Sequence, residues 1–133
     1  GATGELLSLR SVLWHLVQEQ QVTYFMEEPE TLVKRLDNDG GTTYGEAVRR
    51  PVALPSLEQT LNDDVDIEVF AETARSIFTN GLAFNGQSEV GQLSRHMFLV
   101  LEVELARFGG EVAPASLPLE TGRSMITFVR AYE

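Results

Sequence analysis

Apolar residues recur at intervals of three and four through most of this 133-residue chain, and that spacing is the period of an amphipathic α-helix. Alternation of the strand type appears nowhere before residue 121, and no segment is repeated. We therefore predict an all-α fold. The expected main helices cover residues 5–20, 55–61, 66–83 and 88–108.

Residues suited to helix ends bound these segments. Asp66 and Ser88 precede two of the apolar stripes and carry short side chains whose oxygens cap helix N-termini. Pro55 suits a first helical turn, and we expect Gly109-Gly110 to end the last helix. The stripes also predict a shared core, formed by Leu13, Phe70, Ile77, Phe78, Met97 and Leu101.

The helical period fails in a long first connection, residues 21–55, where prolines interrupt it and Asp37-Asn38-Asp39-Gly40-Gly41 is a turn signal. We expect only a short helix there, at residues 30–36. Antiparallel packing of the four main helices predicts a left-handed four-helix bundle with a long loop between helices one and two. The bundle is expected over residues 1–110. Residues 111–133 are expected to form a C-terminal extension, packed on the bundle or flexible, in which residues 121–133 suit a helix or strand.

The composition excludes several classes of function. Twenty acidic against ten basic residues give a net charge of −10, which disfavours direct nucleic-acid binding and attracts basic partners. The absence of Cys excludes disulfides, thiolate zinc sites and a cysteine nucleophile. No apolar stretch reaches the ~18 residues of a membrane span. Gly1 in place of Met suggests either a cloning scar or a domain cut from a longer protein, and we expect a module of a larger protein.

No set of residues predicts a metal site or a catalytic centre. A calcium loop starting at Asp37 needs Gly at its sixth position and Glu at its twelfth, which here are Thr42 and Val48. The acids around Asp66 are explained by helix capping. Neither His15 nor His96 has the neighbours of a nucleophile motif. We expect no enzyme activity and no cofactor.

One stretch resembles the bromodomain family. Pro51-Val52-Ala53-Leu54 opens a short helix, and the next long helix ends with Phe78-Thr79-Asn80 and then Phe84-Asn85. Tyr44 stands seven residues before Pro51, where the family has its loop tyrosine. Tyr24-Phe25-Met26 stands before Pro29, where the family has a tryptophan-proline-phenylalanine shelf. The resemblance covers residues 6–108, and the order and spacing of the motifs carry it.

The resemblance implies a fold and an activity. The fold is the left-handed four-helix bundle expected from the periodicity. The activity is non-catalytic binding of acetyl-lysine on histone tails or other proteins, in a nuclear, chromatin-associated protein. Asn85 would donate its amide to the acetyl carbonyl, and Tyr44 would hold a water on the same oxygen. The remaining expected contacts are apolar: Tyr24, Phe25, Met26, Leu82, Phe84 and Val90.

The chemistry of acetyl-lysine agrees with this expectation. Acetylation removes the lysine charge, and an apolar pocket with one donor accepts the neutral amide but penalises an ammonium that finds no carboxylate to pair with. For Asn85, the alternative is a helix C-cap beside Gly86.

Some residues depart from the family pattern. Leu82 replaces a tyrosine, Gly86-Gln87 replaces two prolines, and Ala53 replaces an aspartate. In such departures the chain is similar to bromodomain factors of protozoan parasites. They leave open an alternative, a degenerate bromodomain-like scaffold that binds proteins without reading acetyl-lysine.

Overall fold

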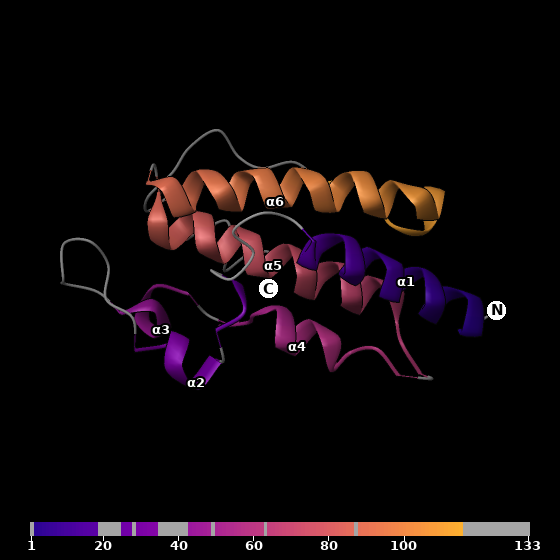
Figure 1. Ribbon diagram of the computed structural model, residues 1–133, viewed down its shortest axis with the longest axis horizontal. Coiled ribbons are helices and arrows are strands. Elements are labelled where there is room, and N and C mark those ends of the chain that lie inside the picture. Colours follow the sequence, from indigo (N-terminus) through magenta and orange to yellow (C-terminus); the bar gives the residue numbers. More distant parts are fainter. Residues whose placement is uncertain are drawn as a thin grey trace.

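The structure, a computed structural model, describes residues 2–18, 25–27, 29–34, 43–48, 50–62, 64–86 and 88–115. Over these ranges every regular element is helical, which confirms the all-α prediction (Figure 1). In order they are α1 (Ala2–Val17), α2 (Pro29–Leu32), α3 (Tyr44–Ala47), α4 (Leu54–Glu58), α5 (Ile67–Asn85), α6 (Glu89–Leu105) and the 3₁₀ helix η2 (Ala106–Glu111). Within the same ranges no helix has the length and apolar character that crossing a membrane requires.

Helices α5 and α6 form a hairpin that runs the length of the molecule (Figure 1). Both N-caps are confirmed: Asp66 Oδ1 accepts a hydrogen bond from Glu68 N at 2.8 Å, and Ser88 Oγ accepts one from Gly91 N at 3.3 Å. Gly86 ends α5 with a φ of 56°, a conformation that glycine adopts without steric cost. Gly86 and the Ser88 cap fix the position of the turn between the two helices, and the Asp66 cap fixes the start of α5.

Side chains from α1, α4, α5 and α6 form one apolar core. The predicted core positions on α5 and α6 are buried, and Leu13 of α1 packs against them partly exposed. Two fully buried residues lie outside the predicted stripes, Val12 of α1 and Phe98 of α6. Each is one position away from a predicted residue, because the buried face of a helix packed on several neighbours is wider than one stripe.

Two glycines allow α5 and α6 to approach closely. A Cβ at Gly81 would overlap Ser94 Oγ and lie 3.2 Å from Ser94 Cβ, and a Cβ at Gly91 would overlap the backbone oxygen of Gly86. Both positions therefore require glycine, because the packing leaves no room for a Cβ atom. The hairpin could not close in this way with larger residues there.

Some predicted boundaries are wrong. The last long helix does not continue to Gly109-Gly110: α6 ends at Leu105, and the backbone tightens into η2, which includes both glycines. The helix expected at residues 30–36 is the shorter α2. Helix α3 was not expected, although Thr43 and Glu46 form a capping box in which Thr43 Oγ1 accepts from Glu46 N at 3.3 Å. The turn at residues 37–41 and the segment 121–133 lie outside the described residues.

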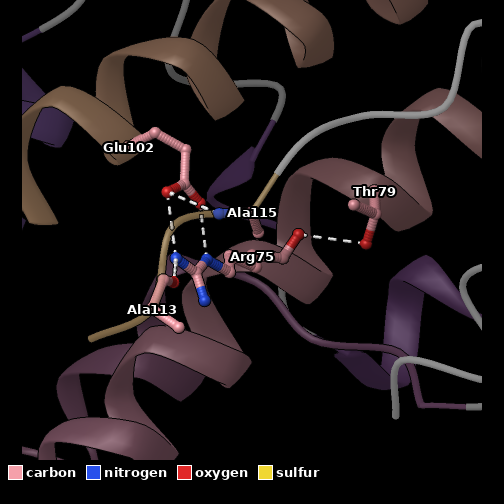
Figure 2. A network of polar contacts seen from close by, with 5 residues as sticks. All are labelled: Arg75, Thr79, Glu102, Ala113 and Ala115. Carbon is pink, nitrogen blue, oxygen red and sulfur yellow. Dashed lines mark hydrogen bonds and ion pairs between the residues drawn. The ribbon is translucent and has the colours of Figure 1, made fainter. Parts of the chain in front are cut away.

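A buried cation holds the segment after η2 against the helices (Figure 2). Arg75 of α5, 7% exposed, donates to both carboxylate oxygens of Glu102 on α6, at 2.5 and 2.9 Å. It also donates to the carbonyl oxygen of Ala113 at 2.8 Å, and Val112 beside it is buried in the core. Residues 112–115 are thus packed on the hairpin.

Candidate functional site

A narrow pocket lies where α5 ends and α6 begins. In Figure 1 this end of the hairpin lies on the same side of the molecule as α2 and α3. The walls of the pocket come from five segments of the chain between residues 25 and 90. The residues that line it are Phe25, Glu27, Tyr44, Val52, Ala53, Ile77, Gly81, Phe84, Asn85 and Val90. Five of these were predicted site residues: Phe25, Tyr44, Phe84, Asn85 and Val90.

Asn85 is the last residue of α5, and its side chain is half-buried at the pocket. Its Nδ2 donates to the carbonyl oxygen of Gly81, one turn earlier, at 2.8 Å. This bond fixes which end of the amide is the donor, because only the nitrogen can face a carbonyl. The NH₂ group has a second hydrogen, so the bond to Gly81 leaves one N–H that a ligand can use. The C-cap position itself belongs to Gly86.

Tyr44 opens α3 and is 4% exposed. The helix is held in place by the Thr43 cap and by a backbone bond from Gly45 N to Val33 O of 3.1 Å. Across the pocket the Tyr44 ring meets Phe84 edge to face, with ring centroids 5.0 Å apart. The long first connection therefore folds back over the end of α5 and contributes one wall.

The segment before α4 is fixed by polar contacts to α5. Asn80, which is fully buried, donates through Nδ2 to the carbonyl oxygen of Arg50 at 2.8 Å, and Arg50 Nη2 donates to Thr73 Oγ1 at 3.1 Å. These bonds hold Val52 and Ala53 at the pocket wall.

The other predicted contacts lie elsewhere. Leu82 is only 1% exposed and does not line the pocket, since it points into packed protein. Met26 is 44% exposed and is also absent from the described lining. Phe25 fills the position instead and stacks edge to face on Phe78, with centroids 5.1 Å apart. Tyr24 lies outside the described residues.

One pocket residue, the carboxylate of Glu27, was not predicted from the sequence. Glu27, half-buried, lines the same pocket as Asn85 and Tyr44. The expectation that an ammonium would find no carboxylate in this pocket is therefore wrong. The only sequence signal was that Glu27 follows the expected apolar wall, and no periodicity in this irregular stretch indicates which way its side chain points.

The pocket is small as well as mixed in character. Its space measures about 20 Å³, enough for about one water molecule. It offers apolar walls with the Asn85 amide, the Glu27 carboxylate and the Tyr44 hydroxyl, which suits binding of a small polar group on an apolar stem. Among the described residues, no three His, Asp or Glu side chains gather as a metal site would require.

Comparison with family models, with curated proteins and with solved structures found no match to this chain. The resemblance to bromodomains therefore depends on this chain's own residues.

Proposed function

We propose that this protein is a non-catalytic reader of acetyl-lysine, built as a left-handed four-helix bundle of the bromodomain kind. One observation carries the proposal. Asn85, Tyr44, Phe25 and Val90, four residues chosen from sequence motifs between positions 25 and 90, line the same pocket.

The pocket chemistry fits an acetylated lysine. The four-carbon stem and the methyl group are apolar and would contact Phe25, Val90 and the other apolar walls. The acetyl carbonyl would accept the second N–H of Asn85, because a buried carbonyl without a donor costs about 1–3 kcal/mol. The net charge of −10 favours encounter with lysine-rich tails such as those of histones, which fits a chromatin-associated module in the nucleus.

The size of the pocket favours a second candidate. An acetamide has four heavy atoms, whereas the space measures about 20 Å³, so the walls must move apart to admit it. A scaffold that binds proteins through another surface, with this pocket unused, needs no such movement.

The test is calorimetry with one histone-tail peptide in acetylated and unmodified forms. Wild type is expected to prefer the acetylated form. Replacement Asn85→Ala is expected to weaken its binding by about 5- to 150-fold, the equivalent of 1–3 kcal/mol.

The matched control is Asn62→Ala. Asn62 is exposed and does not line the pocket, and its Oδ1 accepts a hydrogen bond from Asp64 N within its own turn. It should leave the affinity unchanged. Equal affinity of wild type for both peptide forms, or indifference to Asn85→Ala, rejects the reader and leaves the scaffold.

A further inference from the structure

Three residues with polar side chains line the pocket: Asn85, Glu27 and Tyr44. Asn85 brings an amide N–H, and Glu27 brings a carboxylate, which when ionised only accepts hydrogen bonds. The space between the walls is about 20 Å³. Because Asn85 and Glu27 line the same narrow pocket, we expect a guest bound there to contact both of them.

A secondary amide matches this pair. Its carbonyl oxygen accepts, and its N–H donates. An acyl-lysine presents both groups on adjacent atoms at the end of an apolar stem, so its carbonyl can face Asn85 while its N–H faces Glu27. A carboxylate has about four lone-pair sites, so Glu27 can accept this bond in addition to the contact it makes within the protein.

We propose that Glu27 is a specificity residue that accepts the N–H of the bound acyl-lysine, so that the pocket selects secondary amides over ligands with a carbonyl alone. This inference deepens the proposed function and rests on it. In this role Glu27 accepts a hydrogen bond from a neutral amide and forms no ion pair with the ligand. A hydrogen bond to a charged acceptor is among the stronger ones in proteins, and the half-buried position of Glu27 shields it from water.

The experiment compares two peptides that differ by one atom group. One carries acetyl-lysine, and the other carries its ketone isostere, in which CH₂ replaces the side-chain N–H. Wild type is expected to bind the amide at least about tenfold more tightly than the ketone, the worth of a hydrogen bond to a charged group.

Substitutions of Glu27 test whether this residue causes the preference for the amide over the ketone. Glu27→Met keeps the length of the side chain without an acceptor and should bring the ratio of the two affinities close to one. Glu27→Gln keeps a neutral acceptor and should give an intermediate ratio. The matched control is Glu30→Met, because Glu30 is exposed on α2 and does not line the pocket. It should preserve the wild-type ratio.

The outcomes distinguish a failure of the role of Glu27 from a failure of the reader function. An amide-to-ketone ratio that is the same in wild type and Glu27→Met overturns the role of Glu27 alone, provided that both peptides still lose affinity on Asn85→Ala. Tight binding of the unmodified lysine peptide that disappears in Glu27→Met means that Glu27 pairs with an ammonium, and this also overturns the inference. Binding of neither peptide to wild type overturns the reader function and the inference together.

Discussion

Arg75 of α5 connects three parts of the structure: its own helix, helix α6 and the segment after η2. Its Nε and Nη2 donate to the two oxygens of the Glu102 carboxylate, and Nη2 also donates to the Ala113 carbonyl oxygen (Figure 2). The two-pronged geometry suits the fixed fork of arginine, which lysine cannot reproduce. A buried ion pair is not in itself proof of a net gain in stability, since both charges lose water. Removing one partner, however, leaves the other buried and uncompensated.

The prediction for this pair is a double-mutant cycle. Arg75→Met and Glu102→Met are each expected to lower the free energy of unfolding by about 3–5 kcal/mol. The double substitution is expected to cost less than the sum of the two, because it leaves no charge without a partner. Urea denaturation of the four proteins measures this. Additive single effects would show that the two side chains act independently.

At the scale of the elements, the α5–α6 hairpin depends on a point of close approach. At Gly81 the two backbones come so near that Ser94 occupies the place of a side chain, with Ser94 Oγ bonded to its own helix at Val90 O over 2.7 Å. Elsewhere in a helix, replacing glycine with alanine stabilises by roughly 0.5–1 kcal/mol. At Gly81, however, the methyl group of alanine would overlap the Ser94 side chain.

We therefore predict that Gly81→Ala destabilises the protein, by about 1–3 kcal/mol as for other overpacked sites. Ser94→Gly, which removes the atoms that a Cβ would meet, should restore most of the loss when combined with it. The midpoint of thermal unfolding measures both effects. A more stable Gly81→Ala single variant would mean that the helices separate there at little cost.

A comparison of the helices shows which of them can be predicted from the sequence. Helices α5 and α6 were placed well because their signals are local: a capping oxygen at Asp66 and Ser88, and an apolar stripe after each. Helix α3 has an equally local signal at Thr43 and Glu46, but it is only four residues long and has no stripe. The direction of Glu27 could not be predicted, since it depends on how an irregular connection meets the end of α5.

At the scale of the whole molecule, the helices and the segment after them act as one body. Val112 fills part of the core and Ala113 supplies an acceptor to Arg75. A chain ending at Gly110 loses both, whereas a chain ending at Ala115 keeps them. Helices α1 to α6 are complete in both chains.

We predict that the chain ending at Gly110 is less stable than the chain ending at Ala115 by about 1–3 kcal/mol, as when a buried polar group loses its partner. Chemical denaturation of the two proteins under the same conditions measures the difference. Identical unfolding curves would show that residues 111–115 only rest on the surface.

The contact between Tyr44 and Phe84 has a consequence for the measured affinity. An edge-to-face pair is worth about 0.5–1.5 kcal/mol, and in the free protein these rings border a pocket with room for about one water. If separating them is the cost of admitting a guest, the receptive population is only about 7–30% of the molecules, and the apparent dissociation constant rises by the inverse of that fraction. Binding assays would then understate the strength of the contacts in the occupied pocket by about 3- to 15-fold.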